Sequence, residues 1–418
     1  MQDIRHNLNL RLFDANVQTT AATGLTPGMH TYYENRIIDY AEPHLVHDQF
    51  GDEYTIPQHG GKTIQLRKYS PLSKKLVALS EGVTPDGDNI NMSTLEATLS
   101  QYGNYITVSD ILNMTHVDPQ LEQAAKLLGS QAGRTLDTIS REVMNGGTNV
   151  SYAPKVSGST VTEVLLRADL DAAALLTYKT IFQAAAKLKS MNAVPKDGDS
   201  FSAIVHPNVA CDLMTSDKWI DVHKYATPEN IYKGEIGKLG GIRFCETTEA
   251  KIIAPAVISD NKRRLTVKTA IASSASSVVV KEVLTAASPA TAIPVYINGV
   301  ANTITAIATA DGETTLTVGT AIASLAADAM ICGKGAGKLG HSIYSTLVLG
   351  ANAYGKTGLA GGGLQHILKP LGSAGAADPL NQRATVGWKA SKVTMRLVDE
   401  YMLRIEHCSE TDPFADPN

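Results

Sequence analysis

Two strand-like segments separated by a long polar stretch set the strongest constraint on the fold. Residues 62–69 (KTIQLRKY) and 94–109 (TLEATLSQYGNYITVS) alternate apolar and polar side chains, as half-exposed strands do. The segment between them is rich in Pro, Gly, Asp and Ser, is too long for a tight turn, and contains little apolar surface to bury. We therefore predict a long projecting hairpin. Its edges and apolar positions require a partner chain, because a lone hairpin leaves them in water.

A long amphipathic helix is predicted at 119–145. Asp118 is a suitable N-cap, Pro119 suits the first helical position, and Gly146 and Gly147 end the helix. Apolar residues recur every three or four positions, at Leu121, Ala125, Leu128, Ala132, Leu136, Ile139 and Val143. At 1.5 Å per residue, such a helix is about 40 Å long.

Further elements are predicted before and after residues 256–338. We predict a second helix at about 171–191, a strand in SFSAIVHP and a third helix in NVACDLMTS. Near the end of the chain, the alternating pattern of residues 381–410 predicts strands with a bend at Asp399 and Glu400.

Residues 256–338 differ in composition from the rest of the chain. They are rich in Ala, Thr, Val and Ser, carry few charges, and contain the turn signals NG and DG. This pattern is typical of a small all-β domain, and we expect a sandwich inserted into the main fold. The motif LTVKTAIASSA at 265–275 returns as LTVGTAIASLA at 316–326. It indicates either two related strand units or only the biased composition.

Composition argues against several classes of protein. The 418 residues have a formal net charge of −4, and their Lys and Arg residues are scattered, which is not typical of a dedicated nucleic-acid binder. No stretch has the length and apolar character of a signal peptide or a membrane span. The four cysteines, Cys211, Cys245, Cys332 and Cys408, are far apart and suit free thiols in a reducing compartment.

The segment GANAYGKT at 350–357 matches the P-loop pattern and follows a strand-like run. A P-loop must open a helix, whose N-terminal N–H groups bind the phosphates. Gly358, Gly361, Gly362 and Gly363 follow, and each glycine costs a helix about 1 kcal/mol relative to Ala. The expected metal-binding carboxylate, Asp399, follows a run that is interrupted by a charge. We therefore interpret 350–357 as a glycine-rich turn after a strand.

Other short motifs also lack the surrounding sequence that their usual function requires. His44 and His47 form an H-x-x-H pair without matching ligands nearby, so we interpret them as surface histidines. GAGKLG at 335–340 fits the dinucleotide pattern but precedes a strand-like run instead of a helix. Asp399 and Glu400 are adjacent and would point to opposite faces of a strand. We predict no catalytic, cofactor-binding or metal-binding residues and no cofactor.

Several blocks in order resemble the major capsid proteins of Enquatrovirus-type podophages. They are GKTIQLRKYSPL, LSEGVTPDGDNI, QYGNYITVSDIL, VHPNVACDLM, YKGEIGKLGGIRFCETTEA, LVLGANAYGK and LKPLGSAGAADPLNQRATVGWKASKVTMRLVDEYMLRIE. The resemblance covers about 30–408, with 256–338 outside it. The P-loop look-alike falls in a block that carries no nucleotide chemistry in that family.

The resemblance implies an α+β fold of the Hong Kong 97-like type with an inserted small all-β domain. It implies an N-terminal arm at 1–54, an extended hairpin loop at 55–110, and a peripheral domain at 111–164 with a spine helix at 119–145. The same resemblance lets 376–410 complete the peripheral domain. An axial domain at 165–255 would be completed by 339–375, the insertion would be 256–338, and 411–418 would be a C-terminal tail.

The implied function is structural. The chain would self-assemble through hexamers and pentamers into the icosahedral shell around packaged double-stranded DNA of a tailed phage. Portal, scaffold and decoration or cement proteins would be partners, DNA contact would be non-specific, and no membrane would take part. The protein would reside in the virion, after assembly in the host bacterial cytoplasm, and would not be an enzyme. Two alternatives stay open: a P-loop enzyme that uses Lys356, and an adhesive surface protein built on the β-rich insertion.

Overall fold

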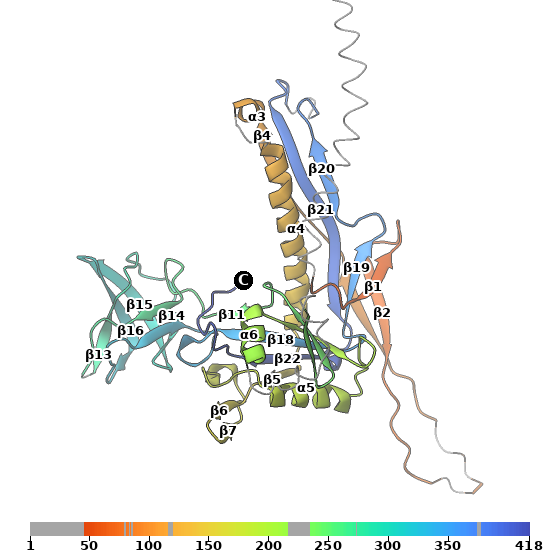
Figure 1. Cartoon of the computed structure of the whole chain (residues 1–418), viewed down its shortest axis with the longest axis horizontal. Coiled ribbons are helices and arrows are strands. Elements are labelled where there is room, and N and C mark those ends of the chain that lie inside the picture. The colour runs from red at the N-terminus through yellow and green to blue at the C-terminus, as the bar shows by residue number, and fades with distance from the viewer. Residues whose placement is uncertain are drawn as a thin grey trace, which may run out of the picture. The chain divides into compact units, whose positions relative to one another are not determined.

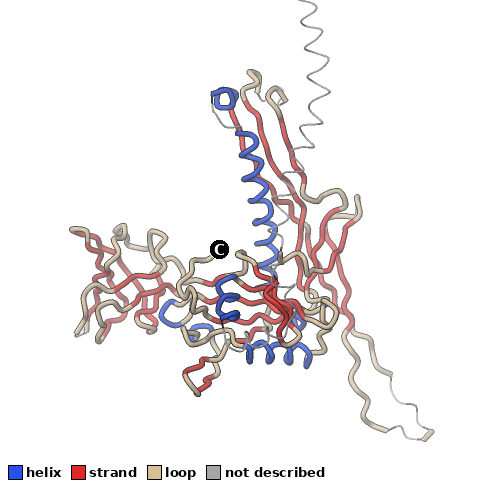
Figure 2. Tube along the Cα trace, in the orientation of Figure 1, coloured by secondary structure: helices blue, strands red, loops and turns tan. Residues whose placement is uncertain are grey.

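The computed structural model describes residues 46–78, 81, 82, 84, 87–115, 120–215, 235–272, 274–373 and 378–418. Contacts divide the chain into unit 1 (Met1–Ser140 and Tyr354–Leu397) and unit 2 (Arg141–Ala353 and Val398–Asn418). Strands make up most of the regular structure in both units (Figure 2). Most of the predicted arm, His44, and the predicted helix start at Asp118 and Pro119 lie outside the described residues.

The long strand β21 (Arg383–Arg396) organises unit 1. It pairs antiparallel with β4 (Ser100–Ser109), β20 (Gln365–Lys369) and β19 (Tyr354–Leu359). A further strand, β1 (Asp52–Ile56), pairs parallel with β19. The even-numbered residues of β21 from position 384 to position 394 are buried, because alternate side chains of a strand share one face.

Helix α4 (Gln120–Asn145) covers the buried face of that sheet (Figure 1). It spans the residues for which the sequence predicts a long helix. Its apolar stripe packs against side chains of β20 and β21; the buried cluster is Ala125, Leu128, Ala132, Leu136, Leu368, Val386, Trp388 and Ala390. Two predicted stripe residues, Ile139 and Val143, are only half-buried, whereas Asp137 and Ser140 are buried. The C-terminal half of the helix therefore turns a polar face inward.

The hairpin of β2 (Thr63–Tyr69) and β3 (Met92–Thr98) extends away from the unit 1 sheet (Figure 1). The buried Leu99 follows β3, and its N–H donates to the carbonyl of Lys62 (2.9 Å), which closes the base of the hairpin. The predicted single strand at 94–109 is therefore divided at Leu99. Its first part belongs to the hairpin, and its second part is β4 in the main sheet.

Unit 2 contains a mixed sheet in the order β5 (Val150–Tyr152), β22 (Met402–His407), β18 (Ile343–Leu349), β8 (Phe201–Val205), β10 (Ile242–Glu246) and β9 (Glu235–Leu239), with β11 (Ile252–Ile253) on β18. Helices α5 (Tyr178–Ser190) and α6 (Pro207–Thr215) pack on its apolar side chains. The predicted second helix begins seven residues late, at position 178 instead of 171, because Thr177 caps it through its side-chain oxygen.

A six-stranded sheet with its own apolar core lies between residues 264 and 333 (Figure 1). Its order is β12 (Arg264–Thr266), β17 (Met330–Gly333), β14 (Ile293–Ile297), β15 (Val300–Ala310), β16 (Glu313–Ile322) and β13 (Ala275–Val280). The two end strands also meet: Lys268 N–H donates to Val279 O (2.8 Å), and Lys281 N–H donates to Thr266 O (2.9 Å). The sheet thus closes into a barrel, rather than the predicted sandwich.

The internal repeat has a structural basis in this barrel. Leu265 and Val267 of the first copy and Leu316 and Val318 of the second copy all point into the core. β12 pairs with β17, which follows the second copy, and β16 pairs with β13, which follows the first. This reciprocal pairing favours two related strand units over a bias of composition.

Strand pairing differs from the sequence-based division at two places. β19 and β20 fall in 339–375, which was expected to join 165–255, but they pair in the sheet of unit 1. β22 falls in 376–410, which was expected to join 111–164. It does pair with β5 of that segment, but its other neighbour is β18, which falls in 339–375. The short 3-10 helix η6 (Asp399–Tyr401) separates β21 from β22, so the predicted bent strand is two strands in different sheets.

A short β-hairpin and two 3-10 helices complete the regular structure described in unit 2. β6 (Lys155–Ser157) pairs with β7 (Thr160–Thr162), and η2 (Arg167–Asp169) follows them. η4 (Lys338–Gly340) leads into β18. In unit 1 the short helix α3 (Asp110–Thr115) follows β4.

We expect Gly387→Ala to lower the free energy of unfolding by about 1–3 kcal/mol, as overpacking of a core does. Gly387 lies opposite Tyr105, and a Cβ on Gly387 would lie 2.9 Å from the Cβ of Tyr105 and 3.0 Å from Asn104 O. Gly363→Ala is the matched control, since a Cβ there meets nothing within 4 Å. Urea unfolding of the two variants tests this, and equal stability would contradict it.

Candidate assembly surfaces and anchors

The hairpin carries large apolar side chains that unit 1 leaves in water. Leu76 and Val77 are each 88% exposed, and Ile90 is 73% exposed. Leu66 and Leu95 lie opposite each other on the two strands and are only half-buried. A concentration of exposed apolar side chains marks an interaction surface, because a monomer gains nothing from it.

The sheet of unit 1 offers a second open surface, on the face that α4 does not cover. A groove of about 710 Å³ runs across β4, β21 and β20. Tyr105 and Ile367 line it and are 69% and 38% exposed, while Lys369 and Lys389 add positive charge. This face combines an aromatic ring with aliphatic surface, and an aromatic ring of this kind is typical of contact with another protein surface.

A buried polar anchor fixes the chain at residues 47 and 48 within unit 1. His47 N–H donates to Asp137 Oδ1 (2.8 Å), and His47 Nδ1 lies 2.6 Å from Asp137 Oδ2. Both residues are fully buried, and the Tyr354 hydroxyl donates to the His47 carbonyl. Burial raises the pKa of Tyr354, so its hydroxyl stays a donor. His47 is therefore a structural residue instead of the surface histidine that the sequence predicts.

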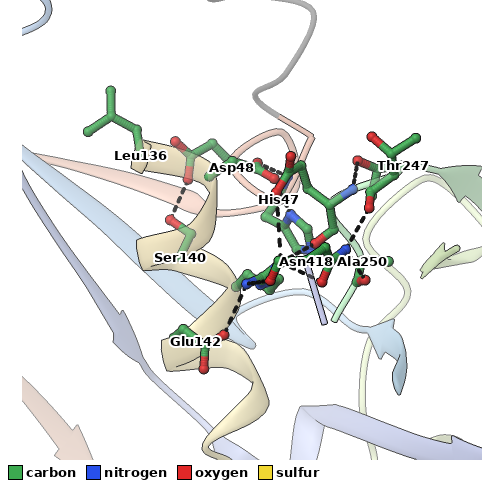
Figure 3. Close-up of polar contacts among 12 residues, drawn as sticks. His47, Asp48, Leu136, Ser140, Glu142, Thr247, Ala250 and Asn418 are labelled. Carbon is green, nitrogen blue, oxygen red and sulfur yellow. Dashed lines mark hydrogen bonds and ion pairs between the residues drawn. The ribbon is translucent and has the colours of Figure 1, made fainter. Parts of the chain in front are cut away.

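The neighbouring Asp48 completes the anchor. Lys392 Nζ donates to both carboxylate oxygens of Asp48 (2.8 and 2.6 Å) and to Leu136 O (2.9 Å). Ser140 Oγ donates to Asp48 Oδ1 (2.6 Å), and Figure 3 shows Asp48 beside Leu136 and Ser140 of α4. Burial lowers the pKa of Lys392, and the nearby Asp48 opposes this effect. Helix α4, β21 and the chain at 47–48 are thus tied together by charge-assisted hydrogen bonds.

In unit 2, buried polar groups lie along strand β22. Glu406 is fully buried and accepts from Arg167 Nε (2.7 Å) and Nη2 (2.5 Å), while Arg404 Nε lies 2.9 Å away. His407 is also fully buried. Its Nδ1 donates to Cys408 O (2.9 Å), so Nε2 of the neutral ring accepts from Thr346 Oγ1 (2.8 Å). Burial lowers the pKa of His407 to about 4, which keeps the ring neutral at physiological pH.

The P-loop look-alike is a strand, a turn and a strand. β18 ends at Leu349, and Lys356 lies within β19, where the pattern requires the first turn of a helix. Lys356 is therefore not in the predicted turn. Its Nζ forms an ion pair with Glu53 Oε1 (2.6 Å) on the adjacent strand β1. The hydrogen bond from Lys356 lowers the pKa of the exposed Glu53.

The remaining sequence motifs also fall in structural positions. Lys338–Gly340 of the GAGKLG motif forms η4 and leads into β18, not into an α-helix. Asp399 and Glu400 lie in η6 and not on a strand. All four cysteines are free thiols.

Within the described part of the chain, no group of three or more His, Cys, Asp or Glu side chains is placed to hold a metal ion. None of the helices formed by the described residues is long and apolar enough to cross a membrane.

Comparisons with known proteins point to one class. A family model described as phage capsid protein matches residues 92–243. The chain is similar to the capsid asymmetric unit of cyanophage Pam1, with a TM-score of 0.52 and 11% identity, over 90% of this chain and 93% of that chain. It is also similar to the capsid of Ralstonia phage GP4, with a TM-score of 0.51 and 12% identity, over 88% and 89%. A search of curated proteins found no match.

The solved structures show that the chain has an α+β fold shared with phage capsid proteins. The region from the second hairpin strand to β10 also matches the family model of phage capsid proteins. Together they support the predicted structural role in a phage capsid. They give no support to a P-loop enzyme or to an adhesive surface protein.

We expect Lys392→Met to lower the free energy of unfolding by about 3 kcal/mol, because the Asp48 carboxylate, only 14% exposed, would lose its cation. Adding Asp48→Asn should recover at least about 1 kcal/mol, since the amide needs no ammonium partner. Lys356→Met is the control on the same sheet and should cost less than about 1 kcal/mol, because its pair with Glu53 is exposed. Similar urea midpoints for the two Lys→Met variants would rule out the anchor.

The buried His407 predicts a loss of stability in mild acid. The unfolded imidazole binds its proton near pH 6.5 and the folded one only near pH 4, so the stabilisation is complete above pH 6.5 and falls towards pH 4. The loss from this residue is about 3 kcal/mol. His407→Asn should flatten the curve of unfolding free energy against pH by that amount. Parallel curves for wild type and variant would contradict this assignment.

Proposed function

We propose that this chain is the major capsid protein of a tailed phage, with a Hong Kong 97-like fold of the Enquatrovirus type. It self-assembles through hexamers and pentamers into an icosahedral shell around packaged double-stranded DNA, and it is not an enzyme. The observation that carries the proposal is the hairpin, whose exposed Leu76, Val77 and Ile90 need a neighbouring subunit. The family match and the shared fold support it.

The hairpin supplies assembly energy that a lone subunit cannot use. Burial of apolar surface stabilises by about 25 cal/mol per Å². We propose that the groove lined by Tyr105, Ile367 and Lys389 is the surface of a neighbouring subunit that receives the hairpin. Each contact can be weak, because closure of a shell links many copies of the same contact.

The two units suggest how the chain is divided in the shell. We propose that α4 is the spine helix of a peripheral domain, and that the mixed sheet of unit 2 is the core of an axial domain. The described end of the proposed arm, 46–54, is fixed in unit 1 by the anchor of His47 and Asp48 and by the pairing of β1 with β19. Segment 411–418 would be the C-terminal tail.

The six-stranded barrel is proposed as an inserted domain on the outer face of the shell. An inward position would crowd the packaged DNA. The closed sheet also suits an exposed position, because its end strands are paired to each other and present no long free edge. Portal, scaffold and cement proteins are further partners in this proposal, and assembly takes place in the cytoplasm of the host.

We expect Leu76→Asp combined with Val77→Asp to abolish closed shells while the subunit keeps its thermal stability. Both side chains are 88% exposed, so the charges disturb the contact between subunits and not the fold. The control is Val300→Asp, an apolar position on the barrel that is 68% exposed. Electron microscopy under conditions in which the wild-type protein forms shells gives the readout. Normal shells from the double variant would refute the role of the hairpin.

A further inference from the structure

The last ten residues, 409–418, form little regular structure but are held by side chains from several parts of unit 2. Near their start, Asp212 of α6 accepts four hydrogen bonds. Its Oδ2 accepts from Ser409 Oγ (2.6 Å) and Glu410 N–H (2.9 Å), and its Oδ1 accepts from Thr411 N–H (3.1 Å) and Thr411 Oγ1 (2.6 Å). One carboxylate thus fixes three consecutive residues to a helix.

The middle of this segment is bound along the beginning of β18. Tyr344 donates its hydroxyl to Asp412 O (2.8 Å). Ser342 makes two contacts: its N–H donates to Pro413 O (2.9 Å), and its Oγ donates to Ala415 O (2.6 Å). Three carbonyls of the segment, at residues 412, 413 and 415, therefore accept hydrogen bonds from two residues at the beginning of β18.

Its end is held by Arg141 and by the turn before β11. Asn418 Nδ2 donates to Thr248 O (2.6 Å) and Ala250 O (2.7 Å), and Asn418 Oδ1 accepts from Arg141 Nη1 (3.0 Å). Figure 3 shows Asn418 beside Ala250 and Thr247. The segment consequently spans α6, β18 and the turn before β11, and is fixed at each of them.

Arg264, the first residue of barrel strand β12, reaches the same place. Its Nε donates to Gly340 O (2.9 Å), its Nη2 to Ser342 Oγ (2.6 Å) and its Nη1 to Phe414 O (3.0 Å). The guanidinium also lies over the Phe414 ring, 5.2 Å from the centroid, and that ring stacks on His341 at 4.9 Å. All three nitrogens of one barrel side chain are thus used outside the barrel.

The barrel also meets the rest of unit 2 at its two chain connections, and Tyr296 and Gly299 at the β14–β15 turn face residues 162–169 across a pocket. These connections pair with each other, since Ala256 N–H donates to Lys334 O (2.9 Å) and Gly333 N–H donates to Arg263 O (3.1 Å). Among the described residues, the strands of the barrel and those of the mixed sheet form separate sheets. Two paired connections behave as a hinge, and a rigid contact on one side of a hinge stops its motion.

We propose that residues 409–418 are a strap that fixes the barrel on unit 2, and that Arg264 is the positioning residue that couples the barrel to the strap. The guanidinium binds the return connection at Gly340 and Ser342 and the strap at Phe414, so it crosses the hinge. This inference concerns the single subunit and does not depend on assembly into shells.

Hydrogen exchange of the full chain tests the strap. Arg264→Met keeps an unbranched side chain but removes every donor. Lys268→Met is the control, since Lys268 pairs with the exposed Glu313 of the barrel itself. We expect the amides of 340–342 and 410–414 to exchange at least about tenfold faster in Arg264→Met, as loss of a charge-assisted hydrogen bond implies. The amides of β15 and β16 should not change. Unchanged exchange in 410–414, or faster exchange throughout the barrel strands, would overturn the proposal.

A second measurement reads the orientation of the barrel directly. Spin labels at Val283→Cys on the barrel and Val194→Cys beside α5 would report one distance, with Cys211 and Cys245 replaced by Ser. We expect a narrow distance distribution in this background and a broad one after Arg264→Met. Phe414→Ala, which lies outside the barrel, should broaden it as well and covers the case in which Arg264→Met does not fold. A distribution that stays narrow in both variants would refute the strap.

Discussion

The packing of α4 against β21 is the contact on which unit 1 depends. The apolar stripe of the helix covers Val386, Trp388 and Ala390, and β21 in turn pairs with three other strands. Gly387 lets β4 approach β21 closely from one side of the strand. At the C-terminal half of α4 the contact becomes polar, and the ion pair of Asp48 with Lys392 replaces apolar packing. Such an ion pair adds little net stability. Any arrangement that separates its partners costs free energy, however, because one charge is then left in the protein without its counter-charge.

This rigid base explains how a hairpin with so little apolar burial of its own can project from the subunit. The base of the hairpin is closed by the buried Leu99, next to the sheet that α4 supports. The apolar side chains further out stay in water until another surface covers them. Their exposure is a cost to the isolated subunit and a source of free energy in an assembly. The hairpin is therefore fixed at its base by packing and hydrogen bonds, while the exposed apolar side chains further out remain available for contact with another subunit.

The barrel, unlike the hairpin, covers its own apolar side chains and its own strand edges. Its core is complete, and its end strands pair with each other, so it exposes neither a large apolar surface nor a long free edge. The backbone hydrogen bonds from Lys268 to Val279 and from Lys281 to Thr266 close the sheet. A domain of this kind can be added to a subunit without offering a new site for unwanted association, provided that its position is fixed by contacts such as those of Arg264.

The sequence by itself determined the elements whose signals are local. The 3.6-residue period from Leu121 to Leu136 predicted α4, and alternation predicted the hairpin strands and β21. The glycines after Lys356 were enough to argue against a helix there. Only the tertiary structure decided which strands share a sheet, since alternation at β19, β20 and β22 shows that one face is covered but not by which partner. It also decided the anchor and the strap: Asp48, Asp137 and Lys392 look like surface residues in the sequence, and their burial follows from contacts 90 or more residues apart. Polar side chains carry no periodic signal of their partners, so long-range ion pairs of this kind appear only when the chain is folded.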